Sequence, residues 1–195
     1  MKWALLAATI LSVLLSWGHN FMGFTNFFLD YIPMYAKFRT VASILVIAEF
    51  TIPLLAALTL KRLVDEPELL GQKMKYAYIS LGLTAGVALL VAVFPDMMGP
   101  FVSDQERQMI NSIQGMDSNT AGTILANVSA MRAAMVSSDA WRSVIVILIG
   151  FALLFAYKMK KLRADYMVAG LLVLCLVDMW QVDKRYLNDE MFVPK

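Results

Sequence analysis

The ionisable side chains that could do chemistry gather in the stretch 17–39, where they are His19, Asp30, Lys37 and Arg39. The guanidinium fork of Arg39 matches the oxygens of a phosphate group, and Lys37 adds a second positive charge nearby. Asp30 is a candidate general base, and His19 could form a polar cluster with it. The alternative is that the cations only anchor a helix end, while His19 and Asp30 only form hydrogen bonds at a membrane surface.

The same stretch is rich in aromatic rings, whose spacing is typical of a helix: Phe21, Phe24, Phe27, Phe28, Tyr31 and Tyr35. Rings mixed with amides and charges suit the level of lipid headgroups, where apolar bodies and polar groups are both accommodated. We therefore expect residues 18–39 to form a re-entrant or interfacial segment.

Glu49 is a second candidate, because it lies near the middle of an apolar run. An ionisable group in hydrocarbon is costly unless it is paired, protonated or hydrated, which makes it a functional candidate by default. Pro53 follows one turn later and frees the backbone carbonyl at position 49. The alternative is a neutral Glu49 that forms a hydrogen bond to a neighbouring helix.

The composition predicts a membrane protein. The 195 residues are 59% hydrophobic and only 16% charged, with a mean hydropathy of +0.65, whereas soluble domains have about 25% charged residues. The net charge of +2 and the lack of a basic stripe exclude a nucleic-acid partner. The single Cys175 and the single histidine exclude disulfides and metal clusters of the usual kinds, so we expect no metal and no cofactor.

Five apolar runs are candidate membrane spans, since a span needs about 20 mostly apolar residues. They are Trp3–Trp17, Thr40–Leu60, Tyr76–Phe94, Trp141–Tyr157 and Ala164–Trp180. The first run resembles a signal peptide, but no small-x-small cleavage site follows it, so we expect a spanning helix. The fold class is thus an all-α transmembrane helix bundle over residues 1–180.

Basic residues predict the orientation of the five spans. Lysines and arginines crowd the connections 61–75 and 158–163, and Lys2 precedes the first span. All three positions fall on one side of the membrane if there are five spans, and that side is expected to be cytoplasmic. The N-terminus would then lie inside and the C-terminus outside, in a bacterial cytoplasmic membrane.

Three pieces are expected outside: the segment 18–39, a loop over 95–140, and a tail over 181–195. The loop should contain two helices. The first, over about 103–114, begins with Ser103 as N-cap and Glu106 three residues later, which is the pattern of a capping box. The second, over about 120–136, places Ile124, Val128, Met131 and Met135 on one face.

Two long segments carry a resemblance to a known family. The sequence LSWGHNFMGFTNFFLDYIPMYAKFRTVASILVIAEFTIPLLAAL resembles the outer loop and following helix of bacterial YfhO-family membrane proteins, with Pro33, Tyr35, Phe38 and Arg39 at the matching positions. The ending VDMWQVDKRYLND is similar to the final portion of that family. YfhO proteins resemble GT-C glycosyltransferases and are several times longer, so the chain looks like a middle-to-late fragment of one.

The resemblance implies transfer of a sugar from a polyprenyl-phosphate carrier to a cell-envelope acceptor. Arg39, with Lys37, would hold the carrier phosphate. The family's acidic residue in its first outer loop has no counterpart here, and Asp30 is a weak substitute. The expected partners are membrane lipids and the lipid-linked sugar.

Two alternatives from other classes stay open. A transporter of lipids or solutes would use Glu49 as its coupling group. A non-catalytic membrane subunit would instead use its outer helices to dock a longer membrane protein.

Overall fold

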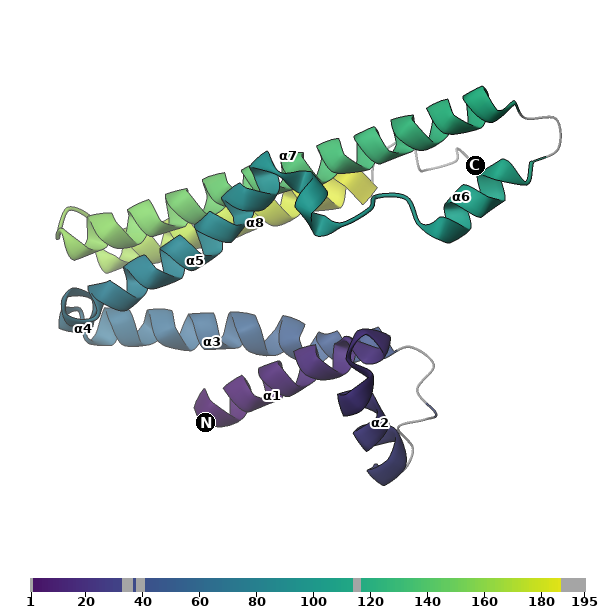
Figure 1. Cartoon of the computed structure of the whole chain (residues 1–195). Coiled ribbons are helices and arrows are strands. Elements are labelled where there is room, and N and C mark those ends of the chain that lie inside the picture. Colours follow the sequence, from purple (N-terminus) through teal and green to yellow (C-terminus); the bar gives the residue numbers. More distant parts are fainter. Residues whose placement is uncertain (1, 33–36, 38–40, 114–116, 187–195) are drawn as a thin grey trace, which may run out of the picture. The chain divides into compact units, whose positions relative to one another are not determined.

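The computed structural model describes residues 2–32, 37, 41–113 and 117–186, and their regular structure is helical (Figure 1). The chain divides into two compact units, Met1–Glu68 and Leu69–Lys195. Each unit has its own helix packing.

The first unit consists of two long helices and a bent aromatic segment. Its elements are α1 (Lys2–Ser16), η1 (Gly18–Phe21), α2 (Met22–Tyr31), η3 (Val41–Ile44) and α3 (Leu45–Asp65). Helix α1 lies along α3 through small and hydroxylated residues. The hydroxyl oxygens of Thr9 and Thr51 are 2.6 Å apart, and the buried Ser12 donates to the Ile44 carbonyl at 2.8 Å. Such close, hydroxyl-bonded packing is typical of helices inside membranes.

A sharp turn separates α1 from α2. Gly18 has a φ of +46°, a left-handed conformation that glycine adopts without a Cβ clash and that commonly ends helices. The axis of the following segment, Gly18–Tyr31, is bent by 101° from α1. Thr25 fixes this bend, because its buried hydroxyl donates to the Gly18 carbonyl at 2.7 Å. Helix α2 therefore runs nearly at right angles to α1.

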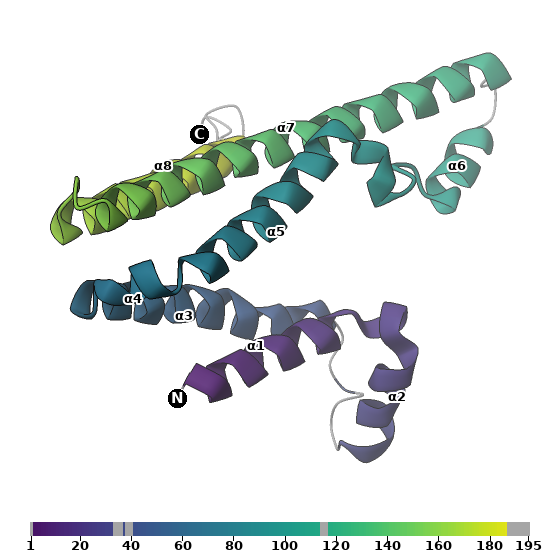
Figure 2. The same ribbon diagram turned by 60° about the vertical axis from the view of Figure 1, so that its left-hand side comes forward.

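The second unit contains the longest helices. Its elements are α4 (Glu68–Gln72), which begins at the boundary, α5 (Met74–Val93), η4 (Pro95–Met98), α6 (Asp104–Asn111), α7 (Ser118–Lys158) and α8 (Ala164–Tyr186). Helices α7 and α8 form an antiparallel hairpin, and α5 lies along α7 on another side (Figures 1 and 2). Lys160, with a φ of 56°, makes the tight turn between α7 and α8.

Helix α7 contacts both of its neighbours through specific residues. Ser137 donates to the Ala92 carbonyl of α5 at 2.7 Å, and the rings of Tyr78 and Phe151 lie 5.6 Å apart. On the other side, Gly170 of α8 approaches Leu153 so closely that a Cβ on Gly170 would lie 3.2 Å from a Leu153 methyl carbon. Small residues thus allow close helix packing in this unit too.

Helices occur where the sequence predicted them, although some bounds differ. The described residues of the five apolar runs are mostly helical, α8 continues past the predicted end at Trp180 to Tyr186, and the Ser103–Glu106 capping box opens α6 as predicted. The predicted helix over 120–136 and the predicted span over 141–157, however, form one helix of 41 residues, α7. No glycine or proline lies between Gly122 and Gly150, so nothing in the sequence ends the helix at Ser137–Arg142.

Three helices are long and apolar enough to cross a membrane: α5, α7, and α8 over Ala164–Lys184. The bent pair of α1 with η1 and α2 would make a fourth. Helix α3 is not among them, because its 21 residues include Glu49, Lys61 and Arg62. Large apolar side chains such as Leu83, Val87 and Leu172 are more than half exposed, as expected for faces that lipid covers. The number of five spans stays a prediction.

Candidate functional site

The rings of the first unit form a continuous series along the bend, which we call the aromatic segment (residues 17–32). Neighbouring ring centroids lie 6.3 Å apart for Trp17–Phe21, 5.7 Å for Phe21–Phe24 and 5.0 Å for Phe24–Phe28. Phe27 and Tyr31 form a further pair at 5.0 Å. Spacings of this size are favourable for aromatic pairs, and they stiffen the exposed helix α2.

The structure does not bring the predicted polar residues of this segment together. His19 lies in η1 and Asp30 in the last turn of α2, so α2 separates them by most of its length. Both side chains are exposed, as is Lys37, and no ion pair joins any of the three within the part of the chain that is described. Arg39 lies outside the described residues. Its proposed role is therefore a matter of sequence alone.

Glu49 is exposed on α3, on the side away from α1. Its neighbours Ala48 and Thr51 are 4% and 5% exposed and face α1 instead. Among the described residues Glu49 has no hydrogen-bonded partner. The alternative of a hydrogen bond to a neighbouring helix is therefore not seen between α3 and α1.

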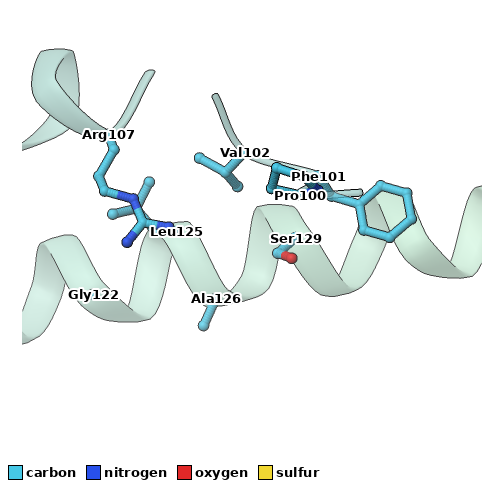
Figure 3. Close-up of a pocket in the computed structure, with 8 residues that line it drawn as sticks. All are labelled: Pro100, Phe101, Val102, Arg107, Gly122, Leu125, Ala126 and Ser129. Carbon is cyan, nitrogen blue, oxygen red and sulfur yellow. The ribbon is translucent and has the colours of Figure 1, made fainter. Parts of the chain in front are cut away.

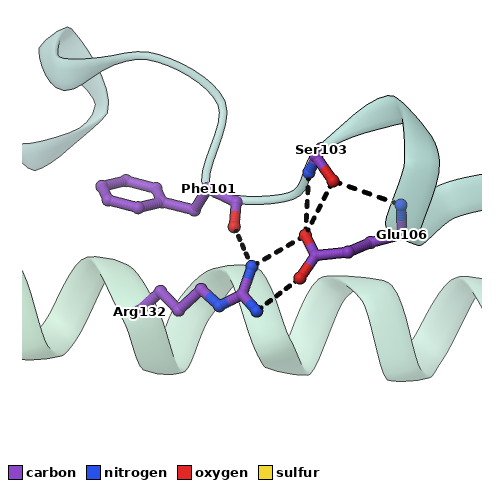
Figure 4. Close-up of polar contacts among 4 residues, drawn as sticks. All are labelled: Phe101, Ser103, Glu106 and Arg132. Carbon is purple, nitrogen blue, oxygen red and sulfur yellow. Dashed lines mark hydrogen bonds and ion pairs between the residues drawn. The ribbon is translucent and has the colours of Figure 1, made fainter. Parts of the chain in front are cut away.

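A polar cluster around Arg132 lies in the second unit. The sequence predicted its capping box but not its ion pair. Arg132 of α7 forms a two-pronged ion pair with Glu106 of α6: Nη2 lies 2.7 Å from Oε1, and Nη1 lies 2.9 Å from Oε2. The same Nη1 donates to the Phe101 carbonyl at 2.6 Å (Figure 4). Glu106 also accepts from the Ser103 backbone N–H at 2.9 Å, which is half of the capping box. The Glu106 carboxylate therefore links the start of α6 to α7 at Arg132.

This arrangement lowers the pKa of Glu106. The pKa falls from 4.5 to about 2, chiefly because Arg132 donates hydrogen bonds to the charged form, with the Ser103 N–H as a further donor. Glu106 is thus a permanently charged structural anchor at neutral pH. Such a group is unsuited to general acid catalysis near pH 7.

A pocket of about 360 Å³ opens next to this cluster. One wall is the segment Pro100–Val102, the other is a face of α7, and Arg107 of α6 stands at one end (Figure 3). The α7 face consists of Gly122, Leu125, Ala126 and Ser129. The lining is mainly apolar, with a guanidinium and a hydroxyl as its polar side chains. Sequence reasoning missed this pocket, because its two walls are 20 or more residues apart in the chain.

A second ion pair joins the two helices of the α7–α8 hairpin. Arg142 Nε lies 3.5 Å from Asp178 Oδ1, with both side chains about one-third exposed. The atom Nε is buried and has no hydrogen bond among the described residues, so the contact is electrostatic only. The two residues lie about 24 and 21 Å from the tight turn, at 1.5 Å per helical residue. The pair therefore sits near one end of the apolar part of the hairpin.

The comparisons with known proteins add no relative. No protein-family model matches the chain, and no match was found among curated proteins or solved structures. Within the described residues, no three of the His, Cys, Asp or Glu side chains are grouped so that they could hold a metal ion.

Proposed function

We propose that the chain is a YfhO-like bacterial membrane protein, part of a GT-C-type glycosyltransferase that moves a sugar from a polyprenyl-phosphate carrier to a cell-envelope acceptor. The proposal is supported by the sequence resemblance of residues 15–58 and 177–189 to that family. It is compatible with the apolar helices α5, α7 and α8. In this proposal Arg39 and Lys37 bind the carrier phosphate, and His19 lines the same surface.

The observation that carries the proposal is the right-angle bend at Gly18. If α1 crosses the bilayer, a segment bent from it by 101° lies along the membrane surface. Its rings would then sit among the headgroups, as interfacial aromatic residues do. Lys37 and Arg39 follow α2 in the sequence, and in this proposal they bind the lipid-linked phosphate among the headgroups.

The proposed topology has five spans, with α3 as the second and the N-terminus in the cytoplasm. Supporting it, lysines and arginines cluster at the α3–α5 and α7–α8 connections. The segment containing α6 and the first half of α7 is then extracytoplasmic. In the topology proposed here, the aromatic segment and the α6 region share one compartment.

The test is binding of a polyprenyl-phosphate sugar by the chain in nanodiscs. Replacing Arg39 with alanine should weaken binding by about 1.5–3 kcal/mol, the range for hydrogen bonds to charged groups. The matched control is Arg62→Ala, because Arg62 is an exposed arginine at the far end of α3 from Arg39. Unchanged affinity in Arg39→Ala, or an equal loss in Arg62→Ala, would remove the basis of the proposal.

A second proposal is favoured by the position of Glu49, exposed and without a hydrogen bond among the described residues. A carboxyl group on a membrane helix that gains and loses a proton can couple transport of a lipid or solute. In proteoliposomes containing a fluorescent phospholipid, Glu49→Gln should then abolish transbilayer movement and leave the circular dichroism spectrum unchanged. Equal lipid movement with and without the wild-type chain would exclude this function for that substrate.

A further inference from the structure

The pocket beside α6 combines an apolar lining with the guanidinium group of Arg107. Val102, only 7% exposed, lines one wall of the pocket, and Leu125 of α7 lines the other. Figure 3 shows the Arg107 side chain reaching from α6 toward α7, close to Leu125. At about 360 Å³, the space is at the lower end of the range of small-molecule sites, roughly 300–1,000 Å³.

Arg132 and Arg107 differ in the contacts that their guanidinium groups make. The positive charge of Arg132 is already paired with the Glu106 carboxylate, and its Nη1 also donates to the Phe101 carbonyl. Arg107 is exposed and, among the described residues, has neither an ion pair nor a hydrogen bond to its side chain. Asp104, three residues earlier on α6, is exposed and forms no ion pair with Arg107 among the described residues, and the Glu106 carboxylate is already paired with Arg132. The positive charge of Arg107 is therefore open to an incoming anion.

The position of the pocket along α7 indicates whether a ligand would enter from water or from the lipid. Ser137 contacts the last turn of α5, at Ala92, and so marks the end of the α5 span on α7. Ser129 and Gly122 lie about 12 and 22 Å farther along the helix, at 1.5 Å per residue. Headgroup layers add only about 5–8 Å to each side of the hydrocarbon. If α7 crosses the bilayer beside α5, the pocket then lies beyond the headgroups and opens to water.

We propose that this pocket binds a small water-soluble organic anion, with a phosphate or carboxylate head on an apolar body. The Arg107 guanidinium would hold the head through paired N–H donors, and the Ser129 hydroxyl is a further donor. Pro100, Val102 and Leu125 would cover the apolar body. The proposal is independent of glycosyl transfer, because every residue that carries it lies in the second unit.

The experiment measures protection of a cysteine placed in the pocket. The full chain carries Cys175→Ser and Ala126→Cys, is held in phosphatidylcholine nanodiscs, and reacts with a water-soluble maleimide. Phenyl phosphate is the probe, and saturating probe should slow labelling severalfold. Ser118→Cys, which is exposed on α7 outside the pocket, is the control and should react at an unchanged rate.

Three variants separate a site from a general charge effect. Arg107→Gln should weaken the phenyl phosphate affinity about tenfold or more, the loss expected for a charged hydrogen bond. Gly122→Leu should fill the pocket and abolish protection, since a Cβ there meets no atom within 4 Å and the side chain has room to enter. Arg163→Gln removes the same charge from an exposed position at the α7–α8 turn and should have no effect.

Two further ligands test whether the bound anion comes from water or from lipid, and whether its apolar body contributes to binding. Inorganic phosphate should protect less than phenyl phosphate, and phosphatidic acid in the nanodisc should not protect. Equal protection in Arg107→Gln, or none with the wild-type pocket, would overturn the proposal. Equal protection by inorganic phosphate would overturn the role of the apolar wall, and protection by phosphatidic acid would overturn approach from water.

Discussion

At the residue scale, Glu106 and Arg132 bind α6 to α7 through charge. The helix α6 has only eight residues, too few to be stable in water by itself. It is held because one carboxylate caps its start and accepts both prongs of a guanidinium from α7. The stability of this region should therefore depend on the ionisation of Glu106.

The pH dependence follows from the lowered pKa of Glu106. Because the folded pKa, about 2, lies below the ordinary value of 4.5, the pair stabilises the folded region fully above pH 4.5. This contribution declines as pH falls from 4.5 and is lost near pH 2. Hydrogen exchange of the α6 amides, corrected for intrinsic rates, should show protection at pH 5.5 that falls on acidification.

Arg132→Gln tests the assignment of that effect to Arg132. The pKa of Glu106 should rise but stay below 4.5, because the Ser103 N–H still donates to the carboxylate. Protection of α6 should then be lost at a higher pH than in the wild-type chain. An unchanged acid profile in this variant would mean that the ion pair does not hold α6.

Gly18 is the residue on which the bend of the aromatic segment depends. Replacing it with alanine should destabilise the first unit by about 1–2 kcal/mol, the cost of a left-handed conformation for an L-residue. Gly23→Ala is the matched control, because Gly23 lies inside α2 with nothing within 4 Å of the added Cβ. It should be neutral or stabilising by up to about 1 kcal/mol. Unfolding in mixed detergent–SDS micelles would measure both; equal effects would contradict the role of Gly18.

At the scale of elements, the α7–α8 hairpin depends on close approach at Gly170. A Cβ at Gly150 would meet leucine methyl groups at 3.7 and 3.8 Å, which is ordinary contact, whereas at Gly170 it would meet Leu153 at 3.2 Å. Gly150→Ala should therefore stabilise the hairpin by about 0.5–1 kcal/mol through helix propensity. Gly170→Ala should stabilise the hairpin less than Gly150→Ala does, or should destabilise it. Thermal unfolding followed by circular dichroism compares the two, and a larger gain at Gly170 would contradict the packing described.

The sequence predicted elements better than it predicted their connections. Apolar runs of about 20 residues and the Ser103–Glu106 pattern are local signals, so the helices and the capping box were found. The joining of the predicted helices 120–136 and 141–157 was missed, because Ser137, Ser138 and Asp139 resemble a loop although they are tolerated in a helix. Glu106 and Arg132 are 26 residues apart, and no local pattern links them. The Arg107 pocket, whose walls come from separate parts of the chain, likewise has no local signal in the sequence.

At the scale of the whole molecule, the order of the helices predicts which connections share a compartment. The described helices α5, α7 and α8 can each cross a membrane, and their order places the α3–α5 and α7–α8 connections on one side. Polar residues near Gln72 should then lie opposite to Ser118. This expectation needs no assumption about α1 or α3.

Cysteine labelling of intact cells tests this arrangement. In a Cys175→Ser background, Ser118→Cys should react with a membrane-impermeant maleimide from outside, because both its exposure and the proposed topology place it in the external water. Gln72→Cys should react only after permeabilisation. Labelling of both cysteines from the same side would mean that α5 does not cross the membrane.

The length of α7 has a mechanical consequence. Its 41 residues extend about 62 Å, roughly twice the hydrocarbon thickness of a bilayer. Since no proline or glycine interrupts it between Gly122 and Gly150, a force applied at the α6 end would be transmitted along one continuous helix to the part that packs against α5 and α8.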